Sequence, residues 1–335
     1  MDNLYGKLVR LIKKLPEDRV AEVAELVEKI IDESKSSEVP ECPHCGAPNT
    51  LVVKYGSNGS RQRYRCNKCR KHFSGATKSA LESSRYGEAV WKQAIRDTIG
   101  GVSLDKTAAS LEMTHATAFN MRHKILSALE TAEGLEPTVL NGACEIDDTY
   151  VLESVKGKKI PEGYWRGPRK HGAKASKPGI SNEQVSIMAG VSREGKIYTK
   201  TLNRATPSKE VVFQIFEGRI GRSALILCDG AKSIKALGSV AEVGEAKGGK
   251  GGFYHMNHAN GYHSYIKRRQ NNVSHGVATK YQNRYNALYS SAYGCDAEEL
   301  TEAIYNMLID SSGNFRKNIA EVKTLGILDL GQLIN

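Results

Sequence analysis

The sequence predicts an α/β fold for the larger part of the chain, preceded by a zinc ribbon and a helix-turn-helix. Three observations lead to this prediction. Cysteines occur in two tight pairs, at positions 42 and 45 and again at 66 and 69. A short helical pattern, a tight turn and a longer helical pattern follow between residues 103 and 129. From Val139 onward strand-like segments alternate with helical ones, and 335 residues are enough for two or three domains with a sizeable core.

The paired cysteines form the motifs Cys42-Pro-His-Cys45 and Cys66-Asn-Lys-Cys69. Two such motifs about twenty residues apart have the spacing of a zinc ribbon, because each turns two thiolates toward one point. Segments 51–55 and 61–65 between them are the predicted strands of a hairpin that turns at 56–59. The alternative is a pair of disulfides or a redox dithiol. The cytosolic composition and the doubled spacing favour structural zinc bound by all four cysteines.

The chain carries a formal net charge of +11, which indicates a polyanionic partner. Basic residues follow the ribbon, crowd segment 156–177 and return at 267–269. A solvated basic surface is the alternative interpretation. Because the clusters lie next to predicted DNA-reading modules, we expect double-stranded DNA as the partner. In the ribbon, the residues predicted to contact it are Arg61, Arg63 and Arg65.

Helix-turn-helix order is predicted directly behind the ribbon. A helix over 88–99 stops at two glycines, and helices over 103–111 and 116–129 follow, with Ser103 and Thr114 placed as N-caps. A generic helical hairpin has the same pattern, so it is the basic ribbon in front that favours DNA recognition. The second helix would then enter the major groove. The side chains expected near bases or phosphates are Thr114, His115, Thr117, Asn120 and Arg122.

The remaining segments complete the predicted organisation. Residues 2–35 have the pattern of two short helices with one apolar stripe, which we expect to dock on the rest of the protein or on a second subunit. The predicted boundaries are an N-terminal helical segment 1–38, a ribbon 39–75, a helix-turn-helix 85–135, an α/β domain 138–295 and a C-terminal helical tail 296–335.

The remaining cysteines and the lengths of the apolar runs indicate where in the cell the protein is expected. Cys144 and Cys228 lie in apolar runs and are predicted to be inert core residues, and Cys295 has no metal-ligand spacing. No signal peptide opens the chain, and no apolar run reaches the roughly 18 residues that span a membrane. We expect a cytoplasmic protein without a membrane partner, associated with the nucleoid when bound to DNA.

Two carboxylates are predicted at strands of the α/β domain. Asp147 lies in a strand over 140–152, and Asp229 ends a short buried strand over 224–229. Between them the pattern predicts a hairpin and a helix over 211–220. A carboxylate in such a place is costly to bury unless it is paired or holds a metal. The glycine-rich segments 156–181 and 244–252 are predicted to be flexible loops.

A helix predicted over 258–269 adds polar groups of another kind. Asn260 and Lys267 are seven residues apart, so they share one face of this helix. Most single Asp residues are turn or cap residues, and most single Lys residues are surface cations. The order along the chain favours instead an oxygen-rich site for magnesium or manganese. Two such ions about four ångströms apart activate water or a 3′-hydroxyl in phosphodiester transfer.

With these motifs, the chain resembles DDE-type insertion-sequence transposases of the group that has a zinc-ribbon front end and an RNase H-like catalytic core. The resemblance runs from about residue 40 to 290 and covers both ends poorly. The stretches that carry it are Cys42 to Cys69, Glu145-Ile-Asp-Asp-Thr-Tyr150, Leu227-Cys-Asp-Gly230, Asn260-Gly-Tyr-His-Ser-Tyr-Ile-Lys267 and Gly276-Val-Ala-Thr-Lys-Tyr281.

The resemblance implies a role for each matching residue. Asp147 and Asp229 match the first and second metal-binding Asp of the family, and Asn260 stands where most members have Glu. An amide offers a metal an oxygen but one negative charge less. Lys267 would contact the phosphate near the scissile bond. The implied function is to bind element ends, as a homo-oligomer on DNA, and to catalyse metal-dependent 3′-end cleavage and strand transfer.

Two other functions compete with this one. A catalytically inactive, transposase-derived DNA-binding protein is favoured by Asn260, whereas the presence of both Asp residues and of Lys267 opposes it. A zinc-ribbon transcription factor explains residues 40–130 but leaves the strand carboxylates without a role. Metal-dependent nicking of an element-end duplex separates the enzyme from both binding proteins.

Overall fold

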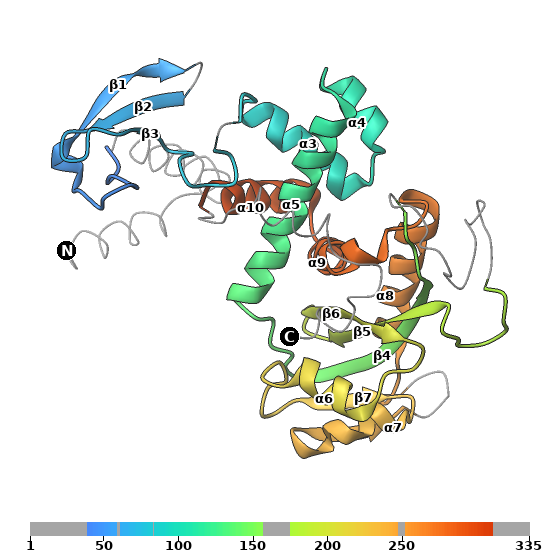
Figure 1. Ribbon diagram of the computed structural model, residues 1–335. Coiled ribbons are helices and arrows are strands. Elements are labelled where there is room, and N and C mark those ends of the chain that lie inside the picture. Colours follow the sequence, from blue (N-terminus) through green and yellow to red (C-terminus); the bar gives the residue numbers. More distant parts are fainter. Residues whose placement is uncertain (1–38, 59–60, 83, 157–174, 247–251, 311–335) are drawn as a thin grey trace, which may run out of the picture. The chain divides into compact units, whose positions relative to one another are not determined.

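The structure is a computed structural model that describes residues 39–58, 61–82, 84–156, 175–246 and 252–310 (Figure 1). The chain divides into two compact units, Met1–Thr77 and Lys78–Asn335. The predicted N-terminal helices over 2–35 lie outside the described residues, as does most of the predicted loop 156–181.

The first unit contains a three-stranded antiparallel sheet in the order β1 (Val52–Asn58), β2 (Arg61–Cys66) and β3 (His72–Ser74). A short turn of 3-10 helix, η1 (Asn49–Leu51), leads into β1. The predicted hairpin is confirmed, and β3 is an addition whose three residues are too few to show a pattern in the sequence. One face of the sheet is buried against the cysteine loops, and its core residues are Cys42, Ala47, Val52, Tyr64, Cys66 and Phe73.

The second unit begins with three helices, α3 (Glu88–Gly100), α4 (Leu104–Ser110) and α5 (His115–Leu135). Both predicted caps are confirmed, because the Ser103 side chain accepts the N–H of Lys106 and the Thr114 side chain accepts that of Thr117. Gly101 ends α3 in the left-handed conformation, with φ of 77°. The sequence therefore encodes this helix-turn-helix order through local signals.

A five-stranded sheet follows in the same unit. Its strands are β4 (Ala143–Leu152), β5 (Gln184–Ser192), β6 (Ile197–Arg204), β7 (Leu225–Cys228) and β8 (Glu242–Glu245). Their order is β6-β5-β4-β7-β8, with β5 antiparallel to its neighbours β4 and β6, β7 parallel to β4, and β8 parallel to β7. Numbered along the chain this is the order 3-2-1-4-5, which is that of the RNase H fold. The predicted fold class is confirmed.

Helices cover both faces of this sheet (Figure 1). On one face lie α6 (Lys209–Phe216), α7 (Lys232–Lys235) and the 3-10 turn η2 (Ala236–Ser239). On the other face lie α8 (Asn257–Arg268), which continues as a π-helical turn over Arg269–Val273, and α9 (Gln282–Ala292), preceded by a 3-10 turn over Thr279–Tyr281.

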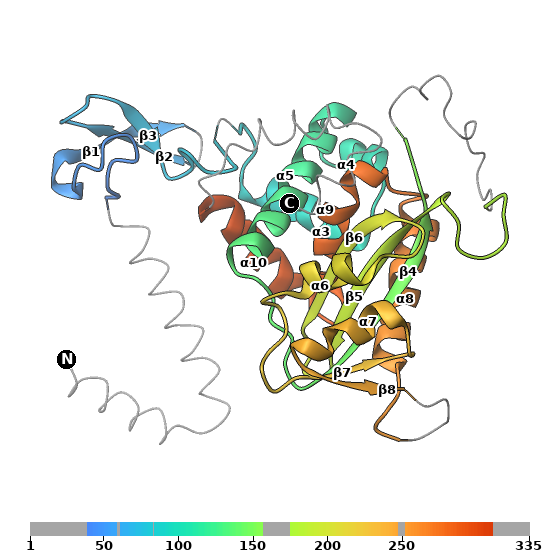
Figure 2. The ribbon, with the colours of Figure 1, turned by 60° about the horizontal axis from the view of Figure 1, so that its bottom comes forward.

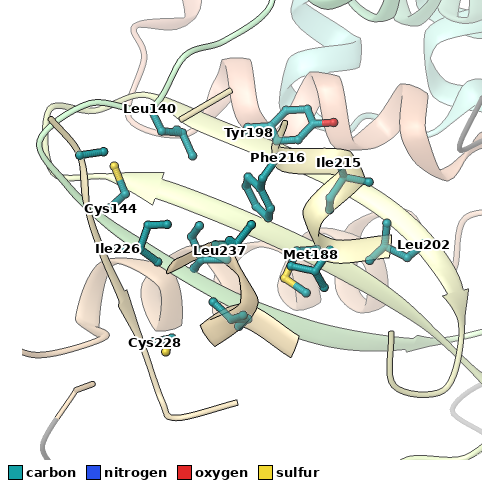
Figure 3. Packing of buried hydrophobic residues seen from close by; sticks show 14 residues of the cluster. Leu140, Cys144, Met188, Tyr198, Leu202, Ile215, Phe216, Ile226, Cys228 and Leu237 are labelled. Carbon is teal, nitrogen blue, oxygen red and sulfur yellow. The ribbon is translucent and has the colours of Figure 1, made fainter. Parts of the chain in front are cut away.

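The apolar core of the domain lies between the sheet and α6, α7 and η2. Figure 3 shows its members, among them Leu140, Met188, Phe216 and Leu237. Cys144 and Cys228 belong to this cluster, which confirms them as core residues, and burial raises the pKa of the Cys144 thiol to about 11. This face of the sheet is filled by the apolar core. The polar groups of β4 and α8 therefore meet on the opposite face.

The described part of the C-terminal segment is helix α10 (Ala297–Asp310), which packs against α3 and α5. The contact includes an ion pair of 2.8 Å between the exposed side chains of Arg96 and Glu298, which are 202 positions apart in the chain. Helix α10 therefore packs onto the helices of the helix-turn-helix and adds to their core.

One loop prediction is wrong. Gly244 and Glu245, the first residues of the predicted flexible loop 244–252, belong to β8. This strand has four residues, two of them acidic, and it is defined only by its pairing with β7. Such pairing between distant segments leaves no mark in local composition.

Candidate functional site

The four ribbon cysteines meet at one point. Their sulfur atoms all lie within 4.8 Å of one another, with Cys42 Sγ 3.6 Å from Cys69 Sγ and Cys45 Sγ 3.8 Å from Cys66 Sγ. Zinc–sulfur bonds of about 2.3 Å place tetrahedral sulfurs about 3.8 Å apart. The donor set and its spacing therefore fit a structural zinc ion, and the disulfide alternative is not adopted because the four cysteines are free.

The local backbone favours ionisation of one of these thiols, that of Cys42. Burial opposes it at Cys42, but the N–H groups of His44 and Cys45 outweigh burial and lower the pKa of this thiol to about 7. Cys45 is exposed, and partial desolvation of its thiol, followed by contacts with the three neighbouring cysteines, raises its pKa to about 11. Four thiols held this close need a cation to be ionised together.

The second site lies where β4 and β7 run side by side. Glu145 pairs with Leu227 in the parallel register, so Asp147, two residues along β4, lies level with Asp229, just after β7. Asp229 accepts the N–H of Ala231 at 3.1 Å in the turn that follows. The two predicted strand carboxylates are thus brought together by adjacent strands.

Helix α8 supplies the other half of this site. Asn260, Ser264 and Lys267 form an exposed stripe at i, i+4 and i+7, while Tyr262, His263 and Ile266 are buried against the sheet. Figures 1 and 2 both show α8 beside β4. A cavity of about 530 Å³ lies between the two elements, and its polar lining includes Asp147, Asp148, Asn260, His263, Ser264 and Lys267.

Negative charge accumulates in this cavity. Burial, together with the charges of Asp229 and Asp148, raises the pKa of Asp147 to about 7, although the N–H of Asp148 and the charge of Lys267 oppose the shift. The pKa of Asp148 is raised as well, first by burial and then by Asp229. The single positive charge of Lys267 does not balance the three carboxylates. The site therefore has an excess of negative charge that a bound cation would neutralise.

The donor set has the chemistry of a hard-cation site. Two carboxylates and the carbonyl oxygen of an amide supply oxygen ligands, which are the ligands that Mg²⁺ and Mn²⁺ prefer. His263 lies beside them, with Nδ1 3.5 Å from Asp147 Oδ2. Burial, and then the charge of Lys267, lower the pKa of His263 to about 4, so its ring is neutral at neutral pH. The residues present therefore fit divalent cations of this kind.

Two acidic residues of this strand had no role assigned from sequence. Asp148 lines the cavity next to Asp147, and its only signal in the sequence is that it adjoins a predicted ligand. Glu145 is fully buried and lies at the start of α8, where its carboxylate accepts the N–H groups of His258 and Ala259. A Glu in an apolar strand is a signal, but its partner is visible only in three dimensions.

The predicted DNA contacts of the ribbon lie on the face of the sheet opposite its core. Tyr64 and Cys66 point inward, so Arg63 and Arg65, which alternate with them on β2, point outward. On the neighbouring strands Tyr55 is exposed and its ring lies 4.4 Å from that of His72. The side chain of Arg61 lies outside the described residues.

The predicted contacts of the helix-turn-helix separate into two groups. Thr114, His115 and Asn120 are exposed and Thr117 is half-buried, along the first turns of α5. Arg122 is different, since its guanidinium donates to the carbonyl oxygen of Val102 at 2.6 Å. This contact joins α5 to the turn between α3 and α4, so Arg122 has a structural partner in addition to any DNA role.

Two segments of the chain match the models of known families. The model of the ISXO2-like transposase domain matches residues 139–288, which contain the five-stranded sheet, Asp147, Asp229 and α8. This segment of the chain is similar to the ISXO2-like transposase family. The model of the PaaD zinc beta ribbon domain matches residues 28–75, which include the four paired cysteines.

Individual relatives are more distant. An uncharacterized protein in transposable element ISH50 of Halobacterium salinarum is 29% identical over 119 residues, which are 35% of this chain and 38% of the relative. Among solved structures, a pre-cleavage Mos1 transpososome has 11% identity and a TM-score of 0.27, and covers 72% of this chain and 80% of that chain. The Mos1 Strand Transfer Complex has 13% identity, a TM-score of 0.28 and the same coverage. The fold is assigned from the strand order, to which TM-scores this low add nothing.

Among the helices in the described part of the chain, none is both long enough and apolar enough to cross a membrane.

Proposed function

We propose that the protein binds the ends of its own insertion element and catalyses metal-dependent cleavage at the 3′ end, followed by strand transfer. The observation that supports this most directly is the cavity between β4 and α8, where Asp147, Asn260 and Lys267 face one space beside Asp229. When bound there, two divalent cations would activate the attacking hydroxyl and stabilise the leaving oxygen. An inactive DNA-binding protein has no need for this convergence.

Each residue of the chain would contribute differently. Asp147 and Asp229 would hold the cations with charged oxygens, and the amide oxygen of Asn260 would complete the set from α8. Lys267 lies two helical turns from Asn260 on the same exposed stripe, where its ammonium group would bind the scissile phosphate. The neutral ring of His263 would fix Asp147 without adding charge.

The α8 stripe can be tested by substitution. We expect Asn260→Ala to lower the nicking rate of an element-end duplex by about 10²-fold, because a neutral ligand is lost and water replaces it in part. Asn260→Asp should retain activity, since it keeps an oxygen ligand and adds charge. Lys267→Ala should cost about 10- to 100-fold at unchanged Mg²⁺ dependence. Asn271→Ala, an exposed amide beyond α8, is the control. Wild-type rates in both Asn260→Ala and Lys267→Ala would contradict the roles given to this stripe.

The outward arginines of the ribbon would bind phosphates of the element end. We expect the double substitution Arg63→Ala with Arg65→Ala to lower the slope of log Kd against log salt by about 2, because each lost phosphate contact removes about 0.9 from it. The control is Lys196→Ala with Arg222→Ala, which removes the same charge at the opposite end of the strands from the carboxylates. It should leave the slope unchanged. Equal slopes for wild type and ribbon variant in titrations of the full chain would contradict this interface.

A further inference from the structure

Glu145 makes an unusual set of contacts for a buried acid. Its side chain has no exposed surface, and five donors reach it. Oε2 accepts the N–H groups of His258 and Ala259 at 2.8 and 3.0 Å. Oε1 accepts Nδ1 of His258 at 2.9 Å and the Arg193 guanidinium at 3.1 Å. Arg193 thus compensates the charge of the carboxylate.

The two backbone contacts belong to the first turn of α8. A helix leaves its first N–H groups without intrahelical partners, and Met256, which precedes α8, supplies no side-chain cap. The Glu145 carboxylate takes the place of that cap from another strand. It also lies at the positive end of the helix dipole, which favours a negative charge.

The position of Glu145 on β4 means that this cap can also fix how α8 lies along the strand. Glu145 and Asp147 lie on the same face of the strand, about 7 Å apart along it. On α8 the matching partners are the 258–259 turn and His263, which are also about 7 Å apart along the helix axis. Because both spacings agree, two contacts fix α8 parallel to β4 and in one register.

We propose that Glu145 is a positioning residue that sets the register of α8 against β4 and thereby places Asn260 and Lys267 opposite Asp147. This inference rests on the proposed function of the cavity. Asn260 directly follows the anchored turn, and Lys267 lies about 6 Å beyond the level of His263. A slip of α8 by a single residue would carry Asn260 away from the carboxylates.

A metal site is the alternative use of these groups. Glu145, His255 and His258 offer three ligand atoms within 4.8 Å of one another. The Arg193 guanidinium already lies among them, since it donates to Glu145 and reaches Nδ1 of His255 at 3.2 Å. The N–H of Asn257 also points at this nitrogen. A cationic side chain therefore stands where a metal ion would bind.

Glu145→Gln tests the positioning role with a side chain of almost the same size and shape. The hydrogen-bond partners of the carboxylate on His258, Ala259 and Arg193 all donate to it, so the amide group of Gln would turn an N–H against another N–H. We expect a 10- to 100-fold lower nicking rate, as for other groups that orient metal ligands. In the full-length protein, hydrogen exchange of the 257–262 amides should also become faster.

Glu153→Gln is the matched control. Glu153 is equally buried, just after the same strand, and pairs with Arg204 at 2.8 Å, far along β4 from the start of α8. It should lower the melting temperature comparably and keep both the nicking rate and the exchange of 257–262 at wild-type values. If Glu145→Gln is insoluble, Arg193→Gln should lower nicking about tenfold and speed exchange over 253–259.

The outcomes are distinct. Wild-type nicking together with wild-type exchange in Glu145→Gln, or in Arg193→Gln where it replaces that variant, would overturn the positioning role. An equal loss of nicking in Glu153→Gln would show that any buried charge has this effect and would overturn it too. Absence of nicking by the wild type would instead contradict the proposed function, and the exchange measurement would still report on the anchor.

Discussion

Asp147→Ala and Asp229→Ala are each expected to lower Mg²⁺-dependent nicking of an element-end duplex by about 10³-fold, because each removes a charged metal ligand worth several kcal/mol in the transition state. Affinity for the duplex should change by less than about threefold, since neither residue has a role in end recognition. The measurement is a single-turnover nicking rate beside a binding titration at the same salt concentration.

A charge-matched control is available in the same domain. Glu217 is an exposed carboxylate that follows α6, and Glu217→Ala should nick at the wild-type rate. A second readout comes from thermal melting. Mg²⁺ should stabilise the wild type more than either Asp variant, because the crowded carboxylates are what binds the ion. Undiminished nicking in both Asp variants would rule out this carboxylate site.

Cys42→Ser is expected to release about one zinc ion per chain and to unfold the ribbon. The ribbon core consists of six buried residues, two of them zinc-site cysteines, so metal binding must supply most of its folding free energy, about 10 kcal/mol or more in domains of this kind. Affinity for the element end should fall by about 10²-fold, because the outward arginines lose their scaffold. Metal analysis, with hydrogen exchange over 52–66, measures both effects.

The other unit should survive this change, because residues 78–335 have their own core. Its thermal transition is therefore expected within a few degrees of the wild type. Cys295→Ser, which alters an exposed cysteine, is the control and should retain the zinc. Freshly purified, reduced wild type without zinc would exclude a zinc-dependent ribbon.

The features that sequence predicted well are those encoded by neighbouring residues. The two C-x-x-C motifs, the caps Ser103 and Thr114, and the strand that carries Asp147 each depend on a few adjacent positions. That Asp147 and Asp229 lie close together was implied by the resemblance. The structure gives the reason, since the two residues belong to adjacent parallel strands.

What sequence did not predict depends on contacts between distant segments. Strand β8 exists through its pairing with β7, and Arg122 turns toward Val102 because the turn of the helix-turn-helix brings that carbonyl within reach. Glu145 stood inside a recognised motif, yet its partner is a helix start more than a hundred positions away in the chain. These contacts orient the predicted residues and carry no periodic signal of their own.

The most direct test uses the wild-type protein and a duplex that carries the terminal repeat flanking its gene. The products are resolved at single-nucleotide length with Mg²⁺, with Mn²⁺ and with a chelator. The predicted result is a nick at the 3′ end of the element that requires the divalent cation and leaves a 3′-hydroxyl able to join a target duplex. A protein that binds this duplex tightly but leaves it intact with either cation would contradict catalysis by the β4–α8 cavity.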